Sequence, residues 1–483
     1  MSRTSTKTPL LLAALLALPA VAAAQATRVK ELRYPPLTAF DIPRPERVVL
    51  DNGMVVLLLE DHELPLIEAT AMIRNGSRLD PADKVGLAGI AANVMRTGGT
   101  QSMPGDALDD WLESRAASVE VSARRDSVRA VLSSLKPDFP EVLRVFADVL
   151  RRPAFDVAKL EVARTQAISD VARQNDDPGD ILFRELNKVV YGADSPYART
   201  ETFASLNGIG REDLVAWHAG ALHPDRVILG VVGDFKRDEV LAQIRQAFGD
   251  WKRGPAFQPA EAPYRKEPNP GVFHVAKADV TQSFIAMGHL GVRKDDPDFY
   301  ALEVLNQILS GSFAARLFSE IRTRKGLAYS VSGGVDSDWD HPSLAYMYVS
   351  TKTETTGAGI DALLEEARAL EGSRPPTAEE VAKAKQGLVS SFVFTVDSLQ
   401  EALGRQLTLE YYGYPPDWNA KYRAGIEGVT VEQVRKAARH LRPEEFSILV
   451  VGTPEGLDKP LATYGKVTPL DISLPAPPSQ GGR

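Results

Sequence analysis

The segment HPDRVILGVVG at residues 223–233 has a counterpart, RPEEFSILVVG, at residues 442–452. In both segments a proline precedes a run of apolar, largely β-branched residues that ends in glycine, a pattern that predicts a buried strand followed by a turn. The two prolines lie 219 residues apart, and so do the two final glycines. Solenoid repeats have periods of roughly 20–50 residues. A repeat of this length therefore indicates a duplicated domain.

The sequence around these segments predicts groups of strands separated by amphipathic helices. Residues 48–60 predict a hairpin around Asn52-Gly53, because this dipeptide favours a tight turn. Further strands are predicted at 68–74, 119–123 and 345–349, and helices at 140–150 and 360–370. Grouped strands with helices packed on one side are typical of an α+β fold. We therefore expect two homologous α/β-sandwich domains, each with a mostly antiparallel sheet.

A proline-rich stretch separates the two copies. Residues 254–271 contain prolines at 255, 259, 263, 268 and 270. Proline removes backbone donors and prevents regular structure, so this stretch is interpreted as a semi-rigid linker. It divides the chain into an N-terminal domain at 46–253 and a C-terminal domain at 272–462. Residues 463–483 are expected to form a flexible tail.

Residues 1–24 have the composition of a secretory signal peptide. A positive region with Arg3 and Lys7 precedes an apolar run, and Ala22-Ala23-Ala24 offers the small residues of a cleavage site. The apolar run is too short to span ~30 Å of hydrocarbon. We therefore expect a soluble protein exported to the periplasm of a Gram-negative bacterium, with no membrane insertion.

The overall composition narrows the chemistry that the chain can perform. It has 56 Lys and Arg against 64 Asp and Glu, a net charge of −8, which argues against a nucleic-acid partner because such proteins need a basic footprint. The absence of cysteine excludes disulfides, thiolate nucleophiles and cysteine zinc sites. The seven histidines include no pair at i and i+4, and they are interpreted as surface or capping residues rather than metal ligands.

Residues 75–100, NGSRLDPADKVGLAGIAANVMRTGGT, contain an apolar stripe that predicts a helix at 86–97. This segment closely resembles the first catalytic segment of the pitrilysin/insulinase-type zinc peptidases, the inverted zincins. In that family the helix carries His-x-x-Glu-His directly after Gly-Leu-Ala. The two histidines bind one Zn²⁺ and the glutamate activates a water molecule. The resemblance places Gly89, Ala92 and Asn93 at these three positions.

The family's third zinc ligand is a carboxylate on a later helix. Counting back from the segment Asp176-Asp177-Pro178, the resemblance places Asp170 at this position. One carboxylate is not sufficient for a zinc site. No other cluster of histidines and carboxylates with ligand spacing is recognised in the sequence. We therefore expect that this chain holds no metal of its own.

Residues 302–335 carry a second recognisable segment, LEVLNQILSGSFAARLFSEIRTRKGLAYSVSGGV. A helix with a cationic last turn is predicted to end at Gly326, followed by a strand from Leu327. Taken alone, these residues have a sufficient structural explanation. The string from Gly311 to 331 nevertheless resembles the C-terminal half of the same family, in which an arginine and a tyrosine seven residues later reach into the active site. These positions are Arg322 and Tyr329.

The resemblance covers about residues 46–460 and implies a role in a pair of chains. Some members of the family work as two subunits that close like a clam-shell around a chamber. One subunit carries His-x-x-Glu-His and Zn²⁺, and the other has a degenerate zinc helix. We expect this chain to be the second subunit of a heterodimeric zinc metallopeptidase that acts on peptides or unfolded segments. Arg322 and Tyr329 would bind the substrate carbonyl and the oxyanion. The alternative is a catalytically inactive scaffold or peptide-binding protein.

Overall fold

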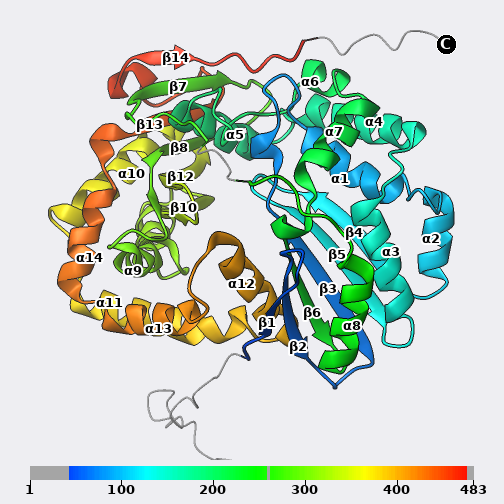
Figure 1. Cartoon of the computed structure of the whole chain (residues 1–483). Coiled ribbons are helices and arrows are strands. Elements are labelled where there is room, and N and C mark those ends of the chain that lie inside the picture. Colours follow the sequence, from blue (N-terminus) through cyan, green and yellow to red (C-terminus); the bar gives the residue numbers. More distant parts are fainter. Residues whose placement is uncertain (1–42, 258–261, 476–483) are drawn as a thin grey trace, which may run out of the picture. The chain divides into compact units, whose positions relative to one another are not determined.

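Two six-stranded sheets organise the computed structural model, which describes residues 43–257 and 262–475 (Figure 1). The first sheet has the order β1-β2-β6-β3-β5-β4, and the second has the order β10-β12-β8-β13-β7-β14. A small sheet pairs β9 (Val292–Arg293) with β11 (Ser337–Asp338). The predicted signal peptide at 1–24 lies outside the described residues.

The strands of the first sheet are β1 (Glu46–Val49), β2 (Val55–Glu60), β3 (Leu66–Ile73), β4 (Ser118–Ala123), β5 (Val128–Leu135) and β6 (Val227–Gly233). Those of the second are β7 (Gly271–Ala276), β8 (Gln282–Leu290), β10 (Ser330–Val335), β12 (Leu344–Lys352), β13 (Ser447–Gly452) and β14 (Val467–Pro469).

The duplication is confirmed by strand order and direction. The series β2-β6-β3-β5-β4 corresponds to β7-β13-β8-β12-β10, with one parallel pair at the same place in each. The segments 223–233 and 442–452 form β6 and β13 with the short turns before them. Every residue of both strands is buried. A strand covered on both faces is expected to be a continuous apolar run. The mixed α and β content with two duplicated sheets agrees with the predicted α+β class.

The helices of the first half are α1 (Leu87–Thr97), α2 (Gly105–Glu113), α3 (Phe139–Arg151), α4 (Val157–Arg173), α5 (Pro178–Tyr191), α6 (Phe203–Asn207), α7 (Arg211–Ala221) and α8 (Arg237–Phe248). Those of the second half are α9 (Phe299–Ser310), α10 (Thr356–Glu371), α11 (Ala378–Phe392), α12 (Leu399–Tyr412), α13 (Trp418–Gly428) and α14 (Val431–Ala437).

One helix from each half packs against the sheet of the other half. The sequence predicted helices on one side of each sheet and did not predict this exchange. On α12, Leu403 and Leu407 pack against Leu57 and Ile228 of the first sheet. In return, residues of α5 pack against the second sheet, where they share a buried cluster with Phe273, Val275, Ala286, Leu344, Leu449 and Val451. This exchange joins the halves through apolar cores, and the described residues from 43 onward cluster as one unit. The linker at 254–271 is therefore not their only connection.

The expectation of a flexible tail from residue 463 is wrong for its described part. Residues 467–469 form β14, which pairs in parallel with β7, and the Leu470 amide donates to the carbonyl of His274 at 2.8 Å. Asn175 Nδ2 donates to the carbonyl of Ile472 at 2.7 Å. The proline-rich composition hid a short edge strand, a position that tolerates proline because one side of its backbone is unpaired.

The linker has no helix or strand between α8 and β7 within its described residues. It is nevertheless attached to the first half. Ser195 Oγ donates to the carbonyl of Pro263 at 2.8 Å, and Arg226 donates to that of Pro255 at 3.2 Å. The side chain of Ala262 is buried. These contacts fix the linker against the N-terminal half.

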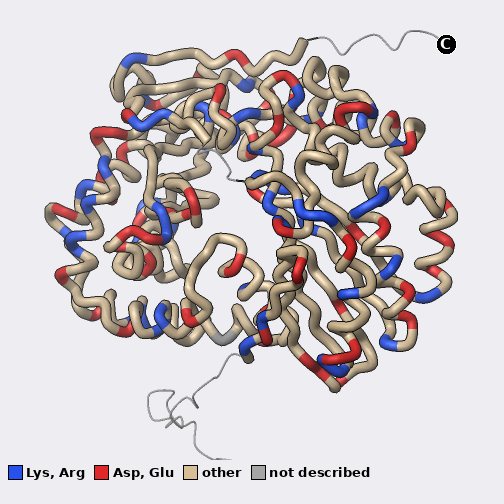
Figure 2. The backbone as a smooth tube through the Cα atoms, viewed as in Figure 1, with Lys and Arg blue, Asp and Glu red and all other residues tan. Residues whose placement is uncertain are grey.

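Acidic and basic residues are interspersed over both halves (Figure 2). Within the described residues, no helix combines the length and the apolarity needed to cross a membrane.

The interpretation of all histidines as surface or capping residues is wrong for three of them, since His274, His289 and His341 are buried. His289 is the clearest case. Its Nδ1 donates to the carbonyl of Leu290 at 2.7 Å, and its Nε2 accepts from the Arg442 amide at 3.0 Å. Only the neutral ring can accept at Nε2. Burial lowers the pKa of His289 to about 4.

We expect His289 to make the protein sensitive to acid. The unfolded chain takes up a proton near pH 6.5, whereas the folded chain takes it up only near pH 4, so stability is present above pH 6.5 and is lost as the pH falls between these values. The loss is about 3 kcal/mol. Urea unfolding from pH 7 to pH 4 measures it. His289→Gln is expected to flatten this pH dependence. An unchanged pH profile in that variant would show that other groups cause the effect.

Candidate functional site

The helix that corresponds to the family's zinc helix is α1, and it is well formed. Ala92 is fully buried, whereas Gly89 and Asn93 are exposed. A side chain at position 89 would meet no atom within 4 Å of its Cβ. Because residues four apart share a helix face, positions 89 and 93 lie side by side on the exposed face of α1. The backbone for two zinc-binding histidines is therefore present, but the imidazoles are not. Glycine, alanine and asparagine do not provide the ligands or the base that a catalytic zinc needs.

The N-terminus of α1 is held by a buried carboxyl group. Asp80 accepts from the amides of Gly86 and Ala88 at 3.0 and 3.1 Å, which satisfies two donors that have no partner within the helix. Burial raises the pKa of Asp80 to about 7. Gly86 has φ +104, a backbone conformation that favours glycine. These contacts keep α1 in place although it lacks zinc ligands.

The position expected for the third ligand, Asp170, is on α4, which packs beside α1. Its side chain is exposed and accepts from Gln166 Nε2 at 2.9 Å. Burial, and next the negative charge of Asp170, raises the pKa of Glu201. Glu201 was not identified from the sequence, because no spacing relates it to Asp170. The carboxyl groups of Asp170 and Glu201 therefore both lie near α1.

Two histidines should restore metal binding if α1 is a degenerate zinc helix. We expect the variant Gly89→His/Asn93→His to bind one Zn²⁺ per chain, because imidazoles at i and i+4 point in the same direction. Metal analysis after dialysis and competition with a chromogenic chelator measure this. Each single variant is the control and is expected to bind zinc much more weakly. Equal, weak binding by the single and double variants would show that positions 89 and 93 do not converge.

The second candidate segment adopts a helix of unusual form. Residues 318–324 form a π-helix, η4, in which the Lys325 amide donates to the carbonyl of Glu320 at 3.0 Å. Short π-helical segments are rare and frequently occur at functional sites. The sequence predicted a regular helix, because an apolar stripe does not distinguish one helix type from the other. Gly326 has φ +64 and ends the helix as predicted, but the strand begins at residue 330 rather than at 327.

Arg322 is exposed and lies over an aromatic ring. Its guanidinium carbon is 4.6 Å from the ring centroid of Phe318, a favourable cation–π geometry. Phe313 meets the ring of Phe318 edge-on at 4.8 Å, and its side chain is 79% exposed. We call Phe313, Phe318 and Arg322 the aromatic platform. The apolar pattern of the sequence places Phe318 in a helical stripe, but it does not show that the half-buried ring faces Arg322 and Phe313.

The charged neighbours of Arg322 have other partners. Arg324 pairs with Glu320, and Lys325 pairs with Glu365. Arg322, in contrast, forms no ion pair with any other described residue. A surface cation that rests on a ring and has no acidic partner can bind an acceptor from another molecule.

Arg316, from the same string, has a structural role. It forms a two-pronged ion pair with Glu380, with distances of 2.6 and 2.7 Å, and donates to the carbonyls of Arg374 and Pro375. Burial alone would raise the pKa of Glu380, but hydrogen bonds from Arg316 and Thr377 lower it to about 2. This pair fixes the start of η4 against α11.

Tyr329 lies directly before β10, the edge strand of the second sheet. Its amide donates to the carbonyl of Ser350 at 3.0 Å, whereas its side chain is 74% exposed. Within the described part of the chain, its hydroxyl group makes no hydrogen bond. The backbone is thus fixed by the sheet while the phenol projects from it. The structure holds Arg322 and Tyr329 at the two ends of one short connection, both exposed.

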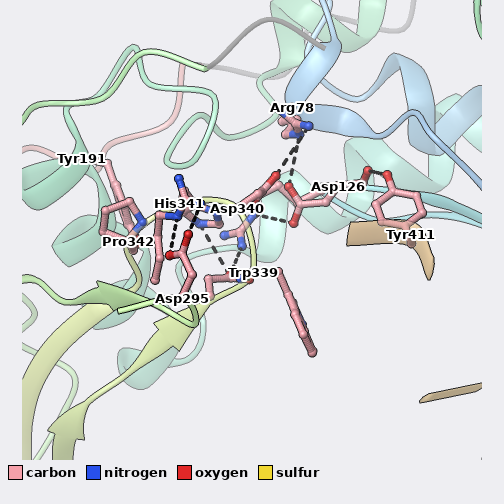
Figure 3. Close-up of polar contacts among 12 residues, drawn as sticks. Arg78, Asp126, Tyr191, Asp295, Trp339, Asp340, His341, Pro342 and Tyr411 are labelled. Carbon is pink, nitrogen blue, oxygen red and sulfur yellow. Dashed lines mark hydrogen bonds and ion pairs between the residues drawn. The ribbon is translucent and has the colours of Figure 1, made fainter. Parts of the chain in front are cut away.

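The sequence-based statement that no histidine–carboxylate cluster exists is wrong. Two groups could bring three ligand atoms together: Asp296, Asp298 and His440, and Asp338, Asp340 and His341. In the second group, Arg125 is 3.1 Å from Asp338. Arg78 is 3.7 Å from Asp340 (Figure 3). These arginines already supply positive charge. In the first group, Asp298 pairs with Lys436 and His440. Neither group is therefore interpreted as a metal site.

Two duplicated α+β halves, a helix α1 with Gly89 and Asn93 at the two histidine positions, and an exposed arginine–tyrosine pair are the features of a zinc-peptidase fold. Residues 55–200 match the model of the insulinase family, peptidase family M16, and residues 208–388 match that of the M16 inactive domain. The chain belongs to the M16 peptidase family.

Similar proteins span nearly the same length. A protein of Helicobacter pylori named "non-peptidase homolog YmxG" is 25% identical over 403 residues, 82% of this chain and 91% of its own length. An "uncharacterized zinc protease YmxG" of Bacillus subtilis is 23% identical over 419 residues, which are 85% of this chain and 98% of its own length. The solved M16 inactive domain from Pseudomonas fluorescens is 26% identical, with a TM-score of 0.76, and covers 86% of this chain and 100% of its own. A protease structure from Helicobacter pylori, 19% identical with a TM-score of 0.73 over 85% of this chain and 99% of its own, shares the fold.

Proposed function

We propose that this chain is the zinc-free subunit of a two-subunit M16 peptidase that degrades or processes peptides and unfolded segments. Its partner is a homologous chain with His-x-x-Glu-His, which brings Zn²⁺ and the general base. The segment 1–24 supports export to the periplasm as the place where the two subunits meet. The observation that carries the proposal is the contrast between the two halves. The α1 face at Gly89 and Asn93 carries no zinc ligands, whereas Arg322 and Tyr329 are exposed and form no ion pair or side-chain hydrogen bond with another described residue.

The two exposed residues have the chemistry that peptide hydrolysis requires from a second subunit. When water attacks a peptide bond, negative charge develops on the carbonyl oxygen. A phenol and a guanidinium both donate hydrogen bonds to such an oxygen, and fixed donors of this kind stabilise the transition state more than the substrate. Phe318 keeps the guanidinium of Arg322 above its ring, which limits the reorientation needed at the moment of reaction.

Co-expression with an exported homologue that carries His-x-x-Glu-His tests the proposal. We expect a complex in size-exclusion chromatography, zinc in the complex but not in this chain alone, and peptide cleavage only by the complex. The control is a partner whose glutamate is replaced by glutamine, which should assemble without activity. Full activity of the partner alone, unchanged when this chain is added, would contradict the proposal.

A second candidate function is a non-catalytic scaffold or peptide-binding protein with a peptidase-like fold. The relative from Helicobacter pylori that is named a non-peptidase homolog favours it. In this case Arg322 and Tyr329 would be remnants, and peptides would bind without being cut in any mixture. The two candidates therefore differ in one measurement, cleavage by the assembled pair.

A further inference from the structure

A cavity of about 340 Å³ lies where helix α12 of the second half covers the first sheet. Its walls come from three places: the open face of β3 and β5, the turn between β4 and β5, and one side of α12 with Trp339 beside it. This position is distinct from α1 and from the aromatic platform. Cavities of this size between packed elements, lined by a few converging polar groups, are typical of small-ligand sites.

Two arginines give the cavity its charge. Arg124 and Arg129 both line it, and neither side chain forms an ion pair or a hydrogen bond with any other described residue. The acidic residue of the lining, Asp126, is already paired with Arg78 and Arg125. Two uncompensated guanidinium groups therefore face one small space, in a chain whose net charge is −8. Both arginines are exposed, and an anion bound in the cavity would be attracted by two positive charges.

Both arginines project from a rigid backbone. Arg129 lies on β5, paired with Met72 on one side and Ser122 on the other. In the turn, the Arg124 amide donates to the carbonyl of Ser127 at 2.7 Å, and the Arg124 carbonyl accepts from the Ser77 amide at 3.0 Å. A site built on fixed backbone loses little conformational entropy when a ligand binds.

On the α12 side of the cavity, Gly404 contributes no side chain to the wall. This residue lies in the middle of α12, where glycine costs about 1 kcal/mol relative to alanine. A Cβ at position 404 would meet no atom within 4 Å, so packing does not require glycine there. The ring of Tyr412 stacks on that of Trp339 at 5.4 Å and 8°, which provides a flat apolar wall. Thr408 adds a hydroxyl group to the same side.

We propose that this cavity binds an anionic group, a carboxylate or a phosphate, between Arg124 and Arg129, with the body of the ligand against Trp339 and Tyr412. Guanidinium groups match both anions because each presents a planar fork of donors. The anion can come from the free carboxyl end of a short peptide or from a phosphate compound. The proposal is independent of the proposed function, because the cavity involves neither Arg322 nor Tyr329.

Isothermal titration calorimetry with the full chain tests the proposal with two probes. The first is inorganic phosphate, and the second is trialanine with a free carboxyl end, compared with its amidated form. We expect saturable binding of at least one probe at low salt, weakened by added salt because the attraction is electrostatic. Binding of phosphate alone identifies a phosphate site, and binding of trialanine but not of its amide identifies a peptide carboxylate. If neither probe binds at millimolar concentration, the proposal is overturned.

Variants of the cavity separate this site from general attraction to a charged surface. Arg124→Gln and Arg129→Gln should each weaken binding at least about tenfold, since each removes a charged donor. Arg144→Gln is the matched control, because Arg144 is an exposed arginine of α3 outside the cavity, and it should bind as the unmodified chain does.

Gly404→Leu fills the space without changing any charge. We expect this variant to be folded and at least as stable as the unmodified chain, because leucine favours a helix, and to lose binding. Binding that survives all three cavity substitutions would place the anion elsewhere and overturn the proposal.

Discussion

Replacing Tyr329 by phenylalanine is expected to reduce peptide cleavage by the assembled pair about 100- to 1,000-fold. This is the loss observed when one donor to a developing oxyanion is removed, roughly 2.7–4 kcal/mol of transition-state stabilisation. The substitution deletes only a hydroxyl group. That group makes no hydrogen bond within the described chain, and the side chain is 74% exposed. Folding and assembly should therefore be unchanged. Steady-state kinetics on a fluorogenic peptide, at matched complex concentration, measure the effect.

The kinetic parameters distinguish this role from simple substrate binding. A donor that acts in the transition state lowers kcat and kcat/KM together, whereas loss of uniform binding raises KM alone. Tyr300→Phe is the control, because Tyr300 is a half-buried tyrosine of α9 whose loss of a hydroxyl group should leave cleavage unchanged. Cleavage by Tyr329→Phe at the unmodified rate would remove the catalytic role and favour the scaffold.

Much of the fold could be predicted because many of its turns and strands depend on residues that are close together in the sequence. The Asn52-Gly53 turn, the two buried strands that follow Pro224 and Pro443, and the left-handed Gly326 depend on local chemistry, and each is found where the sequence placed it. The exchange of α5 and α12 could not be predicted. An apolar helix face shows that a helix is covered, but not which sheet covers it.

In the candidate site, too, features that depend on local sequence could be predicted, and features that depend on contacts between distant residues could not. The positions of Gly89, Ala92, Asn93, Arg322 and Tyr329 follow from motif spacing, and the structure places them on α1, on η4 and before β10. Glu201 and the contact between Phe318 and Arg322 were not predicted, because both depend on how side chains meet in three dimensions and not on spacing along the chain. The burial of His341 was missed for a similar reason, since its surroundings come from both halves of the chain.

Arg78 joins the two halves through buried charge. It lies in the short helix at 77–79, and its side chain is only 9% exposed. Its guanidinium is 3.3 Å from Asp126 of the first half and 3.7 Å from Asp340 of the second (Figure 3). His341 Nδ1 pairs with the same Asp340 at 2.8 Å. Arg78 therefore compensates two half-buried carboxylates that belong to different halves.

We expect Arg78→Met to reduce the free energy of unfolding by about 3–5 kcal/mol at pH 7, because it removes a buried positive charge that Asp126 and Asp340 share and leaves Asp126 with Arg125 alone. Urea unfolding measures the loss. Arg144→Met is the control and should cost less than about 1 kcal/mol, since Arg144 is an exposed arginine whose ion pair with Glu141 is solvated. Equal unfolding midpoints for both variants would show that Arg78 contributes no more than a surface residue.

The pH dependence of the loss identifies its cause. Burial raises the pKa of Asp126 above its ordinary value even with Arg78 present, and removing Arg78 raises it further. A carboxyl group with a raised pKa in the folded chain favours folding as the pH falls through that pKa, because the folded state binds the proton more readily than the unfolded state does. The cost of Arg78→Met should thus be largest at neutral pH and shrink toward pH 4. A cost that stays constant over this range would point to lost packing of the long side chain instead of uncompensated charge.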